Sequence, residues 1–228
     1  CIPGLTRNGA DFDALAGSLT AAGWRVIAVD LRGRAGSERA ADPSGYNPRA
    51  YADDMVALLR SQKIDKAVFI GTSLGVLVTI TLASRAPGRI AAAVLNDAGP
   101  KVPRDALARI GKYAGKPVPP MDTAQATAYV ESIGKAAFPR FTAEDWRAMA
   151  SRTFRQREDG LLVLDYDPAV IRTTRPWVLW LLRPVLWRAV RGLTARVPVL
   201  VVRGALSDIL PADVARQMAA TSTNARLV

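Results

Sequence analysis

The chain has 228 residues, of which 50% are hydrophobic and 22% are charged, and its formal net charge is +11 with no histidine. This length predicts one globular domain with a sizeable core and room for an elaboration. No run of roughly 18 uncharged apolar residues, the length that a membrane-spanning helix needs, is present, since even "PWVLWLL" ends at Arg183, so we expect no transmembrane segment. The single cysteine, Cys1, can form no disulfide within the chain and fits no metal-ligand spacing. A cytoplasmic protein without a bound metal is therefore expected.

Most of the positive charge falls in residues 101–195, where arginines are dispersed along the chain and mixed with carboxylates. A basic surface of this kind usually keeps a protein in solution and does not by itself indicate a partner. We therefore expect no nucleic-acid partner, and the sequence leaves the oligomeric state open.

The first hundred residues alternate between helical and strand patterns. Apolar residues with helical spacing predict helices over 12–22, 48–59 and 74–85, the second beginning at an Asn47 N-cap followed by Pro48. Short apolar runs predict strands over 24–30, 66–71 and 90–96. Such alternation is typical of a parallel sheet covered by helices.

The pattern changes after Gly99 and returns near the end. Between Gly99 and Ala195 only helical signals appear, including a helix start at Thr142, and then come a strand at 196–204, a helix near 211–220 and the start of a strand at 225. The expected fold is α/β, with a mostly parallel sheet, helices on both faces and an inserted helical cap. We assign residues 1–100 and 196–228 to the core and 101–195 to the cap, whose far boundary the sequence leaves open.

The segment Gly71-Thr72-Ser73-Leu74-Gly75 has the G-x-S-x-G pattern. It follows an apolar strand and opens an apolar helix, which is the context of a nucleophile elbow. In an elbow the serine takes a strained conformation, and side chains two residues away on either side would collide. Ser73 is therefore the candidate nucleophile, and the alternative is a serine in an ordinary strand-to-helix turn.

Several segments resemble the α/β-hydrolase superfamily, in its branch of capped, esterase-like serine hydrolases. The segment "PGLTRNGADFDAL" is similar to the family's His-Gly loop, "VDLRGRAGS" to the loop after the next strand, and "VRGALSDIL" to the strand and turn that carry the acid. The resemblance covers 1–100 and 196–228 well and the cap poorly. It implies an oxyanion hole made by the backbone N–H groups of Leu5 and Leu74, with Pro3 where the family usually has histidine.

The resemblance also implies a carboxylate that orients the catalytic base. Asp208 is the first candidate because its context matches the family most closely, and Asp97, at the end of the 90–96 strand, is the second. Asp208 could instead cap the helix that follows it. In the loop after the second strand, Asp30 and Arg32 are interpreted as a structural ion pair.

Tryptophans recur in "RPWVLWLLRPVLWRAVRG". Packing of the cap onto the sheet is the default interpretation of Trp177 and Trp180, a substrate pocket above Ser73 is the second, and an interfacial membrane helix is the third, although Pro184 would kink it. In the second interpretation, the side chains of Trp177 and Trp180 would contact an acyl group of the substrate.

The reaction predicted from these residues is hydrolysis of a small carboxylic ester through an acyl-enzyme on Ser73, with no cofactor. Cleavage of a carbon–carbon bond, lactone hydrolysis, perhydrolysis and acyl transfer remain open on the same scaffold, as does a noncatalytic binding protein. Both termini look truncated. In the superfamily the histidine follows the last strand, so we expect it beyond Val228, and we expect the 228 residues alone to show little turnover.

Overall fold

The computed structural model describes the backbone of residues 1–171 and 176–228 and the side chains of residues 1–171 and 180–228. Its larger sheet has four parallel strands in the order β1 (Ala67–Thr72), β2 (Ile90–Asn96), β5 (Val199–Val202) and β6 (Ala225–Leu227). The mostly parallel sheet predicted from the sequence is confirmed. None of the helices in the described part of the chain is long and apolar enough to cross a membrane.

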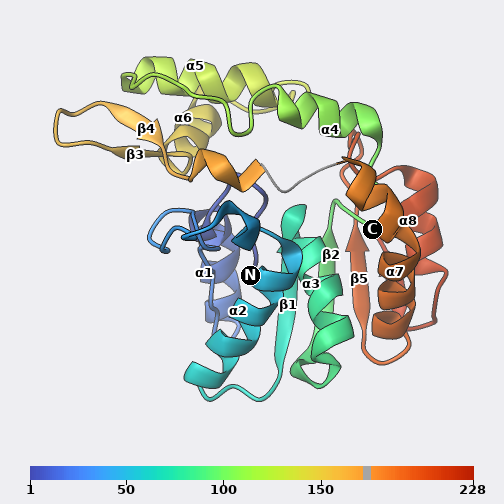
Figure 1. The fold of residues 1–228 in the computed structure, drawn as a ribbon. Helices are drawn as coiled ribbons and strands as arrows, with labels where there is room; N and C mark the ends of the chain where they lie inside the picture. The colour runs from blue at the N-terminus through green and yellow to red at the C-terminus, as the bar shows by residue number, and fades with distance from the viewer. Residues whose placement is uncertain (172–175) are drawn as a thin grey trace.

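The helices that pack on this sheet include α2 (Pro48–Ser61), α3 (Leu74–Arg85) and α8 (Ala212–Ala219), as the alternating pattern predicts, and also α7 (Pro176–Thr194), which lies in the segment assigned to the cap. The predicted helix at 12–22 forms as α1 (Asp13–Ala21), but none of its residues is buried. In Figure 1, α3 lies in front of the sheet between α2 and α7, and it contacts both. The predicted N-cap of α2 is confirmed, because the Asn47 side chain accepts hydrogen bonds from the N–H groups of Arg49 and Ala50.

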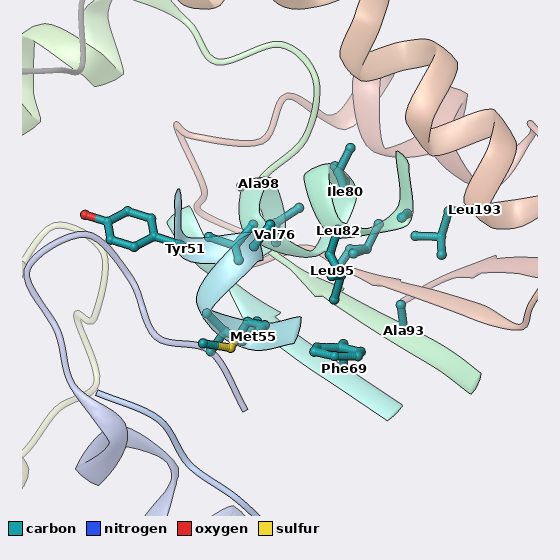
Figure 2. Close-up of a cluster of buried hydrophobic side chains, with 14 of the residues drawn as sticks. Tyr51, Met55, Phe69, Val76, Ile80, Leu82, Ala93, Leu95, Ala98 and Leu193 are labelled. Carbon is teal, nitrogen blue, oxygen red and sulfur yellow. The ribbon is translucent and has the colours of Figure 1, made fainter. Parts of the chain in front are cut away.

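The main core lies between α3 and the sheet. Figure 2 shows Val76, Ile80 and Leu82 of α3 packed among Phe69 of β1 and Leu95 of β2. Because α3 has neighbours on several sides, it is apolar around most of its circumference, as expected for a buried helix. This packing holds the first turn of α3, and with it the elbow, against the ends of β1 and β2.

The predicted strand at 24–30 is wrong as an element of the sheet. The segment is extended, but its pairing is confined to two hydrogen bonds with Cys1: the Cys1 amino group donates to the Ile27 carbonyl (2.7 Å) and Val29 N–H donates to the Cys1 carbonyl (3.1 Å). The Ile2 N–H in turn donates to the Ile70 carbonyl of β1. Cys1 and Ile2 thus lie between 24–30 and β1.

A second group of elements lies above the sheet in Figure 1: α4 (Arg104–Gly111), α5 (Thr123–Gly134), α6 (Ala143–Ser151), β3 (Phe154–Gln156) and β4 (Leu162–Leu164). It has its own hydrophobic cluster, made by Met121, Ala126, Val130, Trp146, Ala150 and Phe154. The predicted helix start at Thr142 is confirmed by a capping box with Asp145. The antiparallel pair β3–β4 departs from the expectation of helices alone, since the turn uses Gly160 at φ +81° to bring two three-residue strands together.

The far boundary of the cap, left open by the sequence, is best drawn before α7. Val190 and Leu193 of α7 are buried in the main core rather than in the second cluster. We therefore propose a division in which the cap ends before α7 and α7 belongs to the layer that covers the sheet.

Candidate active site

The elbow forms at the end of β1. Ser73 has φ 53° and ψ −110°, a conformation that costs a non-glycine residue about 1–3 kcal/mol and persists only where its surroundings impose it. The two glycines of the motif are required by close backbone approaches. A Cβ on Gly71 would lie 2.4 Å from the Gly75 carbonyl oxygen, and one on Gly75 would lie 2.2 Å from the Ile2 carbonyl oxygen.

Neighbouring strands fix the elbow from the side. Ser73 N–H donates to the Asn96 carbonyl at the end of β2 (3.0 Å), and the Asn96 side chain donates to Thr72 Oγ1 (3.1 Å). The Ser73 backbone is thereby tied to β2 as well as to β1. Residues at the end of β2 consequently have a defined position relative to the serine.

The loop expected to form half of the oxyanion hole runs alongside the elbow. Thr72 N–H donates to the Ile2 carbonyl (3.0 Å), and a Cβ added to Gly4 would lie 3.7 Å from Ser73 Cβ. Leu5, whose N–H is the expected oxyanion donor, follows Gly4 in the chain. On the other side of the serine, Leu74 is the first residue of α3, and the first N–H groups of a helix have no partner within the helix.

Arg34 anchors the Leu5 segment, and sequence reasoning did not single it out. Its guanidinium donates twice to the Leu5 carbonyl, through Nε (3.0 Å) and Nη2 (2.8 Å), and once to the Tyr51 hydroxyl (2.6 Å). The residue is only 1% exposed. A signal was present, because Arg34 lies inside the segment "VDLRGRAGS", but the motif does not specify that position.

A cavity of about 600 Å³ opens over Ser73, between the elbow and the cap elements. All three polar candidates, Ser73, Asp97 and Asp208, line it. Much of its opposite wall is aromatic and is provided by Tyr113, Tyr129, Phe138, Phe141 and Tyr166. The structure thus brings together in one cavity the nucleophile and both acid candidates predicted from the sequence.

Asp208 is engaged by an arginine of the cap. Arg109 of α4 donates to both carboxylate oxygens of Asp208, each at 2.7 Å, and the Asp208 side chain remains 51% exposed. The hydrogen bond from Arg109 lowers the pKa of Asp208 below its usual value. This ion pair joins the core to the cap at the cavity, and it gives each carboxylate oxygen of Asp208 a hydrogen-bond partner other than a base.

Asp97 is held in a different way. It directly follows Asn96 at the end of β2 and has φ 57°, a left-handed conformation that is uncommon for a residue with a side chain. Its Oδ1 accepts one hydrogen bond, from Gly204 N–H (3.1 Å), and its own N–H donates to the Val202 carbonyl (2.8 Å). Asp97 therefore combines a fixed backbone position next to the elbow with a carboxylate that no arginine engages among the described side chains.

Two further polar groups of the cavity were not found from the sequence. Arg7 pairs with Asp11 through two hydrogen bonds and also donates to Thr153 Oγ1 of the cap. Tyr113 is a partner of Arg109, and burial raises the pKa of the Tyr113 hydroxyl, which therefore stays protonated at neutral pH. Tyr113 lies outside the quoted motifs, and Arg7 lies in "PGLTRNGADFDAL" at a position to which sequence reasoning gave no role, so only the tertiary fold shows that both line the cavity with Ser73.

The predicted ion pair between Asp30 and Arg32 is wrong. Arg32 instead forms a bidentate ion pair with Asp54 of α2, whereas Asp30 accepts hydrogen bonds from Gly9 N–H (2.8 Å) and Gly36 N–H (3.3 Å). The two side chains serve structural roles, as expected, but with different partners, because α2 packs beside the loop.

The tryptophan prediction has a mixed outcome. Trp180 does not line the cavity over Ser73; it lies on α7 and is 58% exposed. Trp180 is therefore not part of the wall of this cavity. The side chain of Trp177 lies outside the described residues. In the described part of the chain, no group of three or more His, Cys, Asp or Glu residues could hold a metal ion.

Comparison with known proteins places this geometry among hydrolases. A family model described as the alpha/beta hydrolase fold matches residues 1–228. Over 226 residues the chain is 38% identical to a 3-hydroxybutyrate-oligomer hydrolase of Cupriavidus necator, covering 96% of this chain and 76% of that protein. It is 30% identical over 209 residues to a 2-(acetamidomethylene)succinate hydrolase of Mesorhizobium japonicum, covering 92% and 70% of the two chains. The crystal structure of an α/β hydrolase from Novosphingobium aromaticivorans superimposes with a TM-score of 0.89 at 38% identity, covering 100% of this chain and 79% of that one.

Proposed function

Because the chain belongs to the α/β-hydrolase fold family, we propose that it is a serine hydrolase that cleaves a carboxylic ester through an acyl-enzyme on Ser73. The observation that carries the proposal is the strained backbone of Ser73 at the floor of the cavity. A serine in a merely structural turn has no need of φ 53° or of two glycines in backbone contact. Ser73 lines the cavity in which a substrate carbonyl would lie.

In the proposed mechanism Ser73 Oγ attacks the ester carbonyl, and the carbonyl π electrons move onto the oxygen. The N–H groups of Leu5 and Leu74 donate to that oxyanion, a type of interaction that contributes about 10²–10³ in kcat for each donor. The tetrahedral intermediate collapses with loss of the alcohol, which takes up a proton, and water then hydrolyses the acyl-enzyme. Arg34 supports the first step by holding the Leu5 segment against the elbow.

The step in which Ser73 loses its proton needs a base, and the 228 residues contain no histidine. The position of a catalytic histidine beyond Val228 stays a prediction. For the carboxylate that orients the base we now propose Asp97 ahead of Asp208, in the reverse of the order that the sequence suggested. The support is that Arg109 engages both oxygens of Asp208, whereas Asp97 accepts a single backbone N–H.

For the substrate we propose an ester of a short hydroxy acid. The first support is the 38% identity with a 3-hydroxybutyrate-oligomer hydrolase. The second is the cavity wall, where the hydroxyl-bearing rings of Tyr113, Tyr129 and Tyr166 stand among apolar side chains. A wall of this kind can donate hydrogen bonds to a substituted acyl group, and an unsubstituted long chain has no group to accept them.

The test uses the complete gene product and a fluorophosphonate probe, with peptide mapping of the labelled residue. We expect labelling on Ser73, its loss in Ser73→Ala, and unchanged labelling in Ser207→Ala, which removes another serine of the same cavity. Turnover of Ser73→Ala should fall by roughly 10⁴–10⁶. Equal labelling of wild type and Ser73→Ala would refute the nucleophile, and a complete protein that binds esters without any covalent intermediate would be a binding protein.

A further inference from the structure

One exposed apolar surface of the molecule lies outside the cavity over Ser73. On α7 the side chains of Trp180, Leu181, Leu182 and Val185 are 58%, 56%, 43% and 58% exposed, and together we call them the α7 face. Large apolar side chains exposed to this extent on successive helical positions form a patch, unlike singly scattered ones. The α7 face therefore indicates a contact with something apolar.

Unpaired cations border this face. Lys101, Arg104 and Arg183 line a hollow of about 250 Å³ together with Trp180, and we call it the cationic hollow. None of the three cations forms an ion pair with a described residue, and residues 172–179 contain no carboxylate that could provide one. The lining of the hollow contains no acidic side chain, although Asp105 follows Arg104 in the chain. The positive charge is thus left available for an anion.

The rest of α7 continues this arrangement. Its only charged residues are Arg183, Arg188 and Arg191, and Arg188 and Arg191 are exposed. Along the exposed side, apolar residues come first and arginines follow one and two turns later. Helices that lie in the interface of a membrane typically combine exposed Trp and Leu side chains with flanking arginines.

We propose that the α7 face and the cationic hollow form a surface that docks on an anionic lipid membrane. The apolar side chains would enter the headgroup region, and Lys101, Arg104 and Arg183 would contact acidic headgroups. Each cation near such a surface raises the partition coefficient roughly fivefold. The proposal does not depend on the catalytic assignment.

Charge complementarity favours an anionic membrane over a second copy of the chain and over a free anion as the partner of this surface. A second copy of the chain would bring its own net charge of +11, and in a symmetric contact it would place the same cations against one another. A free phosphate or carboxylate would use the cationic hollow but would leave the apolar side chains in water. An anionic membrane would contact the apolar side chains of the α7 face with its lipid and the cations of the cationic hollow with its headgroups.

A second cavity beside the α7 face suggests why docking would matter. Leu182 and Val185 line a largely apolar space of about 470 Å³ that also reaches Leu5 and Leu74, the two residues of the candidate oxyanion hole. The docking surface thus lies on the flank of the elbow. Bound lipid would be close to the catalytic half of the molecule.

The test is sedimentation of the complete protein with vesicles of phosphatidylcholine, with and without phosphatidylglycerol. We expect binding only when phosphatidylglycerol is present and a decrease on the order of tenfold or more in the triple variant Lys101→Gln/Arg104→Gln/Arg183→Gln. The matched control is Arg39→Gln/Arg60→Gln/Lys66→Gln, which removes three exposed cations elsewhere and should bind nearly as wild type does. Equal losses in the two triple variants would show that net charge alone is responsible and would overturn the proposal.

The apolar half is tested by Trp180→Ser against Trp24→Ser, whose side chain is similarly exposed at 56%. Only Trp180→Ser should weaken vesicle binding, and circular dichroism should show both variants folded. One contrary outcome is release of bound protein by inorganic phosphate at an ionic strength where sodium chloride does not release it. That result would reveal a small-anion site and refute the proposed membrane docking. Absence of wild-type binding, or a dimer that Trp180→Ser dissociates, would refute it as well.

Discussion

The elbow and the cap shape the same cavity, but they are held in different ways. Around Ser73, close backbone contacts fix the structure. A Cβ on Gly71 would overlap the Gly75 carbonyl oxygen, and a Cβ on Gly75 would overlap the Ile2 carbonyl oxygen. The cap packs around its own hydrophobic cluster, and side chains such as Arg109 and Arg7 link it to the core. The position of Ser73 is therefore fixed by backbone contacts, whereas the cap side of the cavity is held by side chains that can change individually.

The sharpest test of this contrast compares the two carboxylates. Asp97→Asn should lower kcat by up to about 10⁴ because it would misorient the base, a cost known for this substitution in a catalytic triad. Asp208→Asn should lower kcat much less, because it mainly removes a link to the cap. Steady-state kinetics of both variants of the complete protein decides the matter, and the reverse order of effects would restore Asp208 as the acid.

A second test compares glycines. Gly75→Ala places a Cβ 2.2 Å from a backbone oxygen, and overpacking of this kind costs about 1–3 kcal/mol in the free energy of unfolding. Gly17→Ala, in the middle of α1 with no heavy atom within 4 Å, should instead stabilise by about 0.5–1 kcal/mol. Urea denaturation measures both. If Gly75→Ala proves as stable as wild type, the elbow is more adaptable than its contacts suggest.

A smaller effect is expected on the cap side of the cavity. Tyr113→Phe removes one buried hydroxyl without changing the ring, so it should lower kcat/KM about tenfold for short hydroxyacyl esters and change it little for unsubstituted ones. Trp180→Ala serves as the control and should leave this preference unchanged, because Trp180 does not line the cavity. A parallel loss for both ester types in Tyr113→Phe would mean that the hydroxyl supports the cap rather than the substrate.

The smallest effect concerns the link between cap and core. The pKa of Asp208 is lowered by Arg109, so the ion pair stabilises the folded protein above the usual carboxyl pKa of 3.8 and is lost as the pH falls through the lower pKa of the folded state. Since both side chains are partly exposed, a double-mutant cycle of Arg109→Gln and Asp208→Asn should give a coupling of about 0.2–1 kcal/mol at neutral pH. The coupling should vanish in strong acid, and one that persists there would show that the pair does not act through charge.

The sequence by itself determined the parts of the protein that depend on local backbone requirements. The G-x-S-x-G pattern identified the elbow because only glycine tolerates the close approaches on either side of Ser73, and Asn47 and Thr142 identified helix starts because their side chains cap the first turn. Hydrophobic alternation likewise predicted the parallel sheet, since a buried strand needs apolar side chains along its whole length.

Only the tertiary structure decided how residues distant in the chain meet. Arg109 reaches Asp208 across 99 positions, and Arg34 reaches Leu5 across 29, through contacts that leave no periodic or local signal. The same holds for α7, whose buried Val190 and Leu193 place it on the core, while its exposed Trp180 lies away from the catalytic cavity. Side-chain pairing across elements depends on their packing angles and distances, and those arise only when the whole chain has folded.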